Sequence, residues 1–388
     1  YSLTLDGGDG QDFLFGGSGD DIYILRGGND LANVTQPGGL PTPIDVPVGL
    51  TLPVTANEAG NDRYILRPNS ILTVIDRTGA NALDFGLADF GISFDLSLNT
   101  TSTLTTQDVA PIPLQALSHQ VRTMGTFSAL VGSGFGDNLI GASGATVSSG
   151  GGNDQLIVRA GTTGATFSGG ADDDVLTAEA GLSILNLSFG GDGGIDSMVN
   201  LGTIVGLTFG GGADDDLLTN HGIIRGLTFS GGADDDILRN RLNASIESLT
   251  FGGDDGIDEL VNDGVIGDVL NPTVLGLTFT GGADDDVLTN TGTITRLNFN
   301  GGADDDVLTN VALATISSLN FGGDEGSDSL TNYGTIGSLA FIGGADDDVL
   351  TNNASISSID FSGGADDDVL NNNATVSVLI FRGGADDD

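Results

Sequence analysis

Aspartate residues recur in a six-residue motif whose spacing suits the binding of a hard cation. The motif Gly-Gly-Ala-Asp-Asp-Asp occurs eight times between residues 169 and 388. Variants at 191–196, 253–258 and 323–328 keep the first Gly and the last Asp, but have Gly at the fourth position. The sixth-position Asp is therefore the common requirement, and the fourth-position carboxylate is optional. Carboxylate oxygens are the ligands that Ca²⁺ prefers, usually six to eight oxygens in all.

The repeated carboxylates would repel one another if these turns were stacked. Neighbouring strands lie about 4.8 Å apart, and like charges at that spacing cost roughly 3 kcal/mol per pair at an effective dielectric constant near 20. We therefore predict that multiple Ca²⁺ ions neutralise the turns, since Ca²⁺ suits an oxygen-rich site better than Mg²⁺ does. The alternative is a solvated acidic edge that only prevents aggregation, but such an edge would not need Gly pairs in a fixed register.

The alternation of side chains along an extended chain indicates which Asp residues of each turn are the ligands. Side chains two apart on an extended chain share a side, so Asp304, Asp306 and the core residue Leu308 point one way, and Asp305 points to solvent. We predict that the sixth-position Asp bridges coils and that the fourth-position Asp is an additional ligand. The sixth-position candidates are Asp174, Asp196, Asp216, Asp236, Asp258, Asp286, Asp306, Asp328, Asp348 and Asp368. The fourth-position candidates are Asp172, Asp214, Asp234, Asp284, Asp304, Asp346 and Asp366.

Two further motifs lie in tandem near the start of the chain. Residues 7–15 read GGDGQDFLF and residues 16–24 read GGSGDDIYI, both matching the nonapeptide GGxGxDxUx with U a large apolar residue. This region resembles the RTX (repeats-in-toxin) family of secreted bacterial proteins. The resemblance implies a parallel β-roll, Ca²⁺ held by the motif Asp and backbone carbonyls, and export by a type I pathway. It adds four candidate ligands, Asp12, Asp21, Asp62 and Asp154.

The motifs are positioned by a longer period, which eleven phenylalanines mark from Phe167 to Phe381. Six of the ten gaps between them are 20 residues, three are 22 and one is 28. Such a period is typical of a solenoid, in which each repeat forms one coil. We predict an all-β, right-handed parallel β-solenoid with coils of about 20 residues, in which Phe, Leu and Ile form buried columns.

An Asn two residues after the Leu predicts a stacked amide ladder, comprising Asn220, Asn240, Asn262, Asn290, Asn310, Asn332, Asn352 and Asn372.

The chain divides into two regions by pattern. Residues 1–147 are predicted to form an N-terminal RTX-like roll with an irregular β segment and a Pro-rich surface loop inserted at 31–57. Residues 148–388 form the regular array, which is either truncated or continues at the C-terminus. A second insertion, of eight residues, lies near 267–274. The Gly-type turns recur every third coil, which indicates duplication of a three-coil unit.

Composition excludes several classes of function. With 54 acidic and 11 basic residues the net charge is −43, which argues against nucleic acid as a partner. The chain has no Cys, so it has neither disulfides nor thiolate metal sites. No apolar run approaches the length of a membrane span. The carboxylates repeat identically, whereas an active site is a unique cluster, so we predict no enzymatic activity.

Together these patterns predict a secreted, calcium-stabilised structural protein of the bacterial cell surface. It would serve as a filament, surface-layer or stalk segment, associating end to end or with other surface proteins. One alternative is a calcium-binding folding module of a larger secreted enzyme or toxin. Another is an adhesin whose inserted loops, 31–57 and 267–274, contact a ligand.

Overall fold

The chain folds as an all-β parallel β-solenoid of about 16 turns with coils of about 20 residues, in a computed structural model. The structure describes residues 2–8, 12–14, 19–26, 31–32, 60–69, 71–110, 119–159, 161–181, 183–268 and 276–385. Within these ranges there is one 3₁₀ turn, η1 (Leu96–Leu98), and no α-helix. The predicted fold class is confirmed, while the handedness stays a prediction. Two compact units are present: Tyr1–Ile157 with Ala165–Ser168, and Val158–Gly164 with Gly169–Asp388.

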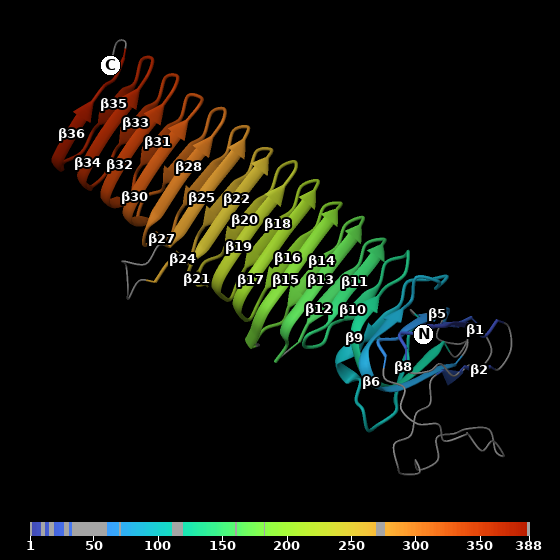
Figure 1. Cartoon of the computed structure of the whole chain (residues 1–388). Coiled ribbons are helices and arrows are strands. Elements are labelled where there is room, and N and C mark those ends of the chain that lie inside the picture. Colours follow the sequence, from blue (N-terminus) through green and yellow to red (C-terminus); the bar gives the residue numbers. More distant parts are fainter. Residues whose placement is uncertain are drawn as a thin grey trace. The chain divides into compact units, whose positions relative to one another are not determined.

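Each coil of the second unit, the array, consists of two sides. The long side carries the Ile, Leu and Phe positions on one strand or on two, the Gly/Asp turn follows, and a four-residue strand completes the coil. In one coil, β27 (Thr293–Ile294) carries Ile294, β28 (Leu297–Gly302) carries Leu297 and Phe299, and β29 (Val307–Asn310) is the short strand. Equivalent strands of successive coils pair in parallel and stack one behind the next (Figure 1). The long strands build one sheet and the short strands the other.

The remaining strands of the array repeat this arrangement. The long side comprises β13 (Thr163–Ala171), β15 (Ser183–Gly193), β17 (Thr203–Ala213), β19 (Ile223–Gly232), β21 (Ser245–Ile246), β22 (Leu249–Asp255), β24 (Val265–Ile266), β25 (Leu277–Ala283), β30 (Thr315–Asp324), β32 (Thr335–Gly344), β34 (Ile356–Gly364) and β36 (Val376–Arg382). The short side comprises β14 (Val175–Ala178), β16 (Ser197–Asn200), β18 (Leu217–Asn220), β20 (Ile237–Asn240), β23 (Glu259–Asn262), β26 (Val287–Asn290), β31 (Ser329–Asn332), β33 (Val349–Asn352) and β35 (Val369–Asn372).

The apolar positions form the predicted columns between the two sheets. Leu288 pairs with Leu308, and Phe279 pairs with Phe299, in neighbouring coils. From Phe209 to Phe381 consecutive rings stack with centroids 4.7–5.1 Å apart and planes within 8° of parallel. Phe381 is the exception to the predicted burial, at 46% exposure, because no coil of this chain stacks beyond it. Between Ile294 and Leu297 the chain bends within one sheet, since both flanking segments, β27 and β28, belong to it.

Truncating one ring of this column tests the core. Phe299 is 3% exposed and stacks 4.9 Å from both Phe279 and Phe321. We expect Phe299→Ala to lower the free energy of unfolding by about 3–5 kcal/mol, the usual cost of deleting a buried ring, as measured by denaturant melts. Asp305→Asn is the matched control, because its side chain is exposed and its Oδ1 is retained. Equal losses in the two variants would contradict the register.

The Asn column at the end of the short strands is the amide ladder that the sequence predicts. Each side chain donates from Nδ2 to Oδ1 of the Asn in the next coil, at 2.8–2.9 Å, from Asn200 through to Asn372. From Asn200 to Asn352 these residues are fully buried. The amides thus close the core at one edge of each coil, because an amide both donates and accepts and so can continue the stack indefinitely.

The first unit is a shorter and less regular roll. Its strands are β1 (Thr4–Asp6), β2 (Phe13–Leu14), β3 (Ile22–Leu25), β4 (Leu31–Ala32), β5 (Arg63–Leu66), β6 (Leu72–Asp84), β7 (Ser93–Asp95), β8 (Thr105–Asp108), β9 (Gln120–Val131), β10 (Asn138–Ile140), β11 (Thr146–Gly151) and β12 (Gln155–Val158). β8 pairs antiparallel with β9, and the other described pairs are parallel. The Pro-rich insertion predicted at 31–57 begins as a strand, β4; residues 33–57 lie outside the described residues, as do 269–275 of the second insertion.

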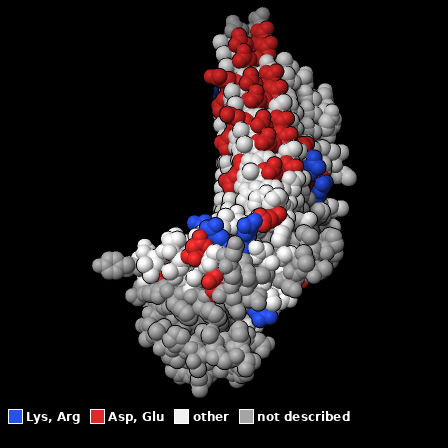
Figure 2. Space-filling view, turned by 90° about the vertical axis from the view of Figure 1, so that its right-hand side faces the viewer, with Lys and Arg blue, Asp and Glu red and all other residues white. Residues whose placement is uncertain are grey.

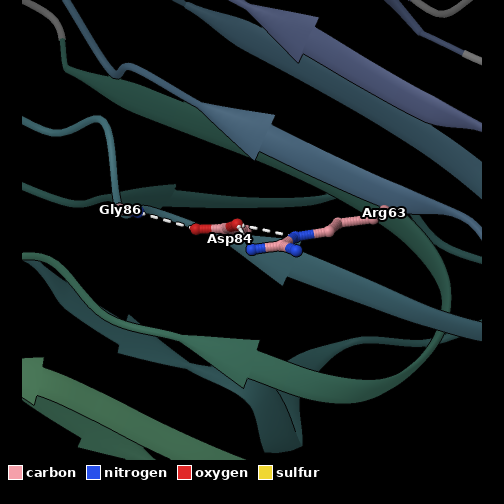
Figure 3. A network of polar contacts seen from close by, with 3 residues as sticks. All are labelled: Arg63, Asp84 and Gly86. Carbon is pink, nitrogen blue, oxygen red and sulfur yellow. Dashed lines mark hydrogen bonds and ion pairs between the residues drawn. The ribbon is translucent and has the colours of Figure 1, made fainter. Parts of the chain in front are cut away.

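An ion pair ties β5 to β6 inside this unit. The buried carboxylate of Asp84 accepts hydrogen bonds from Nε and Nη2 of Arg63 and, at 2.8 Å, from the backbone N–H of Gly86 (Figure 3). Asp84 is 3% exposed, whereas the Arg63 side chain reaches solvent. The contact satisfies a charge that burial would otherwise penalise.

Candidate metal centre

The Gly/Asp turns of the array depend on left-handed backbone at their fourth position. The seven fourth-position Asp residues have φ between 66° and 72°, and Gly194, Gly256 and Gly326 replace them with φ between 108° and 117°. Asp enters this region more readily than most residues. This explains why Asp and Gly alternate at the fourth position, and it confirms that the turn tolerates Asp where the RTX pattern has Gly.

The sixth-position Asp residues form a second buried ladder, at the opposite end of the short strand from the Asn ladder. The backbone N–H of each Asp donates to Oδ1 of the sixth-position Asp in the next coil, at 2.7–3.1 Å, without interruption from Asp174 to Asp368. The side chains are at most 2% exposed. The predicted inward direction of Asp306, shared with Leu308, is confirmed.

The second carboxylate oxygen, Oδ2, has no hydrogen-bond partner in eight of these residues. They are Asp196, Asp216, Asp236, Asp258, Asp286, Asp306, Asp328 and Asp348, and in each of them Oδ2 is buried. Each Oδ2 lies against the first Gly of its own motif and, in all but Asp306, near a backbone carbonyl of the next coil. A Cβ on Gly281, for example, would overlap both Asp286 Oδ2 and the carbonyl oxygen of Gly301. The first Gly is required because a side chain there would fill the space in which two oxygen acceptors converge.

Asn81 shows which hydrogen bonds form when an amide replaces the carboxylate at the ladder position. It occupies the corresponding position in the first unit, and its Oδ1 accepts the Asp62 N–H at 3.0 Å. Its Nδ2, which replaces the carboxylate Oδ2, donates to the carbonyls of Thr78 and Thr126 at 2.7 and 3.2 Å. An Asp at this position presents an oxygen where Asn presents a donor. Since two acceptors cannot bond to each other, the Asp turns require either a proton or a cation between them.

Burial makes these carboxylates hard to ionise without such a partner. Desolvation raises the pKa of Asp216 and Asp286 to about 8, and that of Asp306 and Asp328 to about 7. Negative charges on neighbouring turns raise the pKa further, while the hydrogen bond from the preceding backbone N–H lowers it. The residues therefore fit Ca²⁺ by donor chemistry, because carboxylate and carbonyl oxygens are its ligands.

The outer carboxylates of the turn are exposed, and both sets include hydrogen bonds between coils; in the fourth-position set, Asp214 and Asp346 accept from the N–H groups of Gly194 and Gly326. The fifth-position Asp accepts the N–H of the fifth residue in the next coil, as in Asp305–Asp285 at 2.9 Å and Ser327–Asp305 at 2.7 Å. These bonds run opposite to the sixth-position ladder. The prediction that Asp305 is exposed is confirmed, but the sequence did not reveal its contact. The exposed fourth-position and fifth-position Asp residues together contribute to an acidic stripe on the array (Figure 2).

The structure places three of the four N-terminal candidates, Asp21, Asp62 and Asp154, in shorter ladders. The Asp21 N–H donates to Asp62 Oδ1 at 2.7 Å, and Asp154 Oδ1 accepts the N–H of Asp137 at 2.6 Å. Asp12 directly precedes β2. Asp137 was missed by sequence reasoning: it is buried and accepts from the Ile92 and Ser133 N–H groups at 2.6 Å. Its position two residues before Leu139, as in every array turn, was the signal that could have found it.

Across the described ranges, no three His, Asp or Glu side chains converge to hold a metal ion. Backbone carbonyls would therefore have to complete any coordination sphere, as the RTX resemblance implies.

None of the described helical residues forms a segment long and apolar enough to cross a membrane. No protein-family model matches the chain, and a search of curated proteins found no match either.

Proposed function

We propose that this protein is a calcium-stabilised structural solenoid of the RTX type, secreted to the bacterial cell surface. The observation that carries the proposal is the column of eight buried, unbonded Asp Oδ2 atoms, seven of which lie near a carbonyl of the next coil. A cation at this position bonds to oxygens of two coils at once. Calcium would therefore act as a cross-link along the array.

The sixth-position Asp would supply the carboxylate ligand in each turn, and the carbonyl of the first Gly in the next coil a second oxygen. The fourth-position Asp is exposed beside them and would add negative charge that favours the ion. Bound Ca²⁺ would supply positive charge to a chain with a net charge of −43. In the first unit, Asp21, Asp62 and Asp154 would supply the carboxylate ligands in the same way.

Uniformity of the coils favours a structural role over catalysis. The same ladder bond repeats nine times from Asp174 to Asp368, and no turn of the array carries a distinctive cluster among the described residues. Binding energy spread along a stack in this way stiffens the whole array. The surface location, type I export and association end to end or with other surface proteins rest on the RTX resemblance.

Substitutions in one turn test the ligand assignment. We expect Asp306→Asn to keep the Asp286 N–H bond through Oδ1 and to supply an Nδ2–H donor, as Asn81 does. In thermal melts, the variant should be more stable than wild type in EGTA at pH 8, and should gain less from added calcium. Asp306→Ala should lose stability under both conditions, because it leaves the buried Asp286 N–H unbonded.

The neighbouring carboxylates provide matched controls for that series. Asp305→Asn should leave the calcium-induced rise in melting temperature unchanged, and Asp304→Asn should reduce it by less than Asp306→Asn does. A larger reduction in Asp305→Asn would place the metal on the outer side of the turn. An unchanged calcium response in Asp306→Asn would contradict the proposed ligand.

A further inference from the structure

A pocket of about 440 Å³ opens on the first unit. Its walls come from the starts of β7, β10 and β12 and from the end of β8. This volume lies within the roughly 300–1,000 Å³ typical of small-molecule sites. None of the functions proposed above uses it.

Three neighbouring strands place polar side chains in one row across this pocket. Ser93 and Gln155 are the register partners of Asn138 on either side, so the three side chains lie next to one another. All three are exposed, and none makes a side-chain hydrogen bond within the described structure. Their donors and acceptors are thus available to a ligand.

This row departs from the pattern of the array. The same position, directly after the sixth-position Asp, is apolar in seven of the ten array coils: Val175, Leu217, Ile237, Val287, Val307, Val349 and Val369. It is polar there only in the coils with Gly-type turns, as Ser197, Glu259 and Ser329. A β-branched or other apolar residue is therefore compatible with this strand position. The amides at Asn138 and Gln155 are not required by the coil.

A carboxylate faces the row from a separate element. Asp108 ends β8, and the chain then passes beside β7, where Val109 accepts the Ser93 N–H at 3.0 Å. Below the row, Asp137 is buried with its oxygens bonded to Ser133 and Ile92, which holds the start of β10 in place. Asn153 and Asp137 also line the pocket, which thus combines three carboxamides, a hydroxyl and two carboxylates, one of them buried.

We propose that this pocket binds a neutral saccharide. Carboxamides both donate and accept, which suits hydroxyl groups that do the same, and a carboxylate can accept from two adjacent hydroxyls. The two carboxylates, of Asp108 and Asp137, disfavour anionic ligands, and the many polar groups of the lining disfavour a wholly hydrophobic one. Saccharide binding here would be a function beyond the structural one, because it would give this surface protein a contact with glycans outside both inserted loops.

Saturation-transfer difference NMR on the full chain, in calcium, tests the proposal. The probes are the methyl glycosides of glucose, mannose, galactose and N-acetylglucosamine. We expect saturation transfer to at least one of them in wild type, and a loss of about tenfold or more in the double variant Asn138→Val/Gln155→Val, since two hydrogen-bonding groups are removed. That variant restores the residue type of the array, so its circular dichroism should match wild type.

Two further variants complete the design. Asp108→Asn should weaken binding several-fold, because it removes the charge but keeps the shape. Val307→Asn places an amide at the equivalent array position and should leave binding unchanged. The absence of saturation transfer from all four glycosides, or binding that survives the folded double variant, would overturn the proposal without bearing on calcium.

Discussion

Removing calcium at pH 8 is expected to unfold the array. The circular dichroism signal for β structure should fall in excess EGTA and return when Ca²⁺ is added, because ligands from adjacent coils couple binding to folding. At pH 8 without metal, seven buried carboxylates would face carbonyl oxygens of the next coil with neither proton nor cation between them. Ligand linkage adds about 2.7 kcal/mol for each site held at a hundred times its Kd.

The specificity of this response distinguishes a built site from general charge screening. We expect Mg²⁺ at the same concentration to restore much less structure, since it demands a more rigid octahedral shell. Sodium chloride at matched ionic strength screens exposed charges but does not bond to buried oxygens. A chain equally folded in EGTA at pH 8, or restored equally by salt, would refute the calcium cross-link.

Acidification is expected to replace calcium. The ladder carboxylates have pKa values raised by desolvation, to about 8 for Asp286 and about 7 for Asp306, Asp328 and Asp348. A group with a raised folded pKa stabilises the fold fully below its unfolded pKa, about 4, and loses that contribution as pH rises through the folded pKa. The metal-free protein should therefore melt at a higher temperature at pH 5 than at pH 8, the reverse of the usual behaviour of salt-bridged aspartates.

The mechanism is that a protonated Oδ2 can donate to the carbonyl it faces. Each tenfold difference in ionisation constant is worth about 1.4 kcal/mol, and adjacent rungs titrate together, so their contributions do not simply add. The triple variant Asp286→Asn/Asp306→Asn/Asp328→Asn carries permanent donors and should show a flatter profile of melting temperature against pH. With saturating calcium the wild-type profile should also flatten. A metal-free wild type that gains stability between pH 5 and pH 8 would contradict this assignment.

Sequence parity and period predicted much of the site correctly. The two-residue step between Asp306 and Leu308 placed the sixth-position Asp inside the turn, because side chains alternate strictly along an extended chain. The Phe period gave the register of every coil, since identical residues one coil apart must stack.

Other features depended on contacts between coils, which no single repeat reveals. The sequence could not show that the Asp286 N–H donates to Asp306 Oδ1 while the Asp305 N–H donates to Asp285 Oδ1, because the two bonds run in opposite directions between neighbouring coils. Nor could it show that Asn81 substitutes for a ladder Asp, since its motif has lost the Gly pair.

The sequence alone thus determined the solenoid, its period, its buried columns and the inward Asp, because each follows from a local alternation repeated at a fixed interval. Only the tertiary structure decided what surrounds Oδ2. That environment is made by the first Gly of the same coil and a carbonyl of the next, and it depends on how closely two backbones approach. The polar pocket is of the same kind: Ser93, Asn138, Gln155 and Asp108 are scattered over 63 positions of sequence and converge only because parallel coils bring their strands into register.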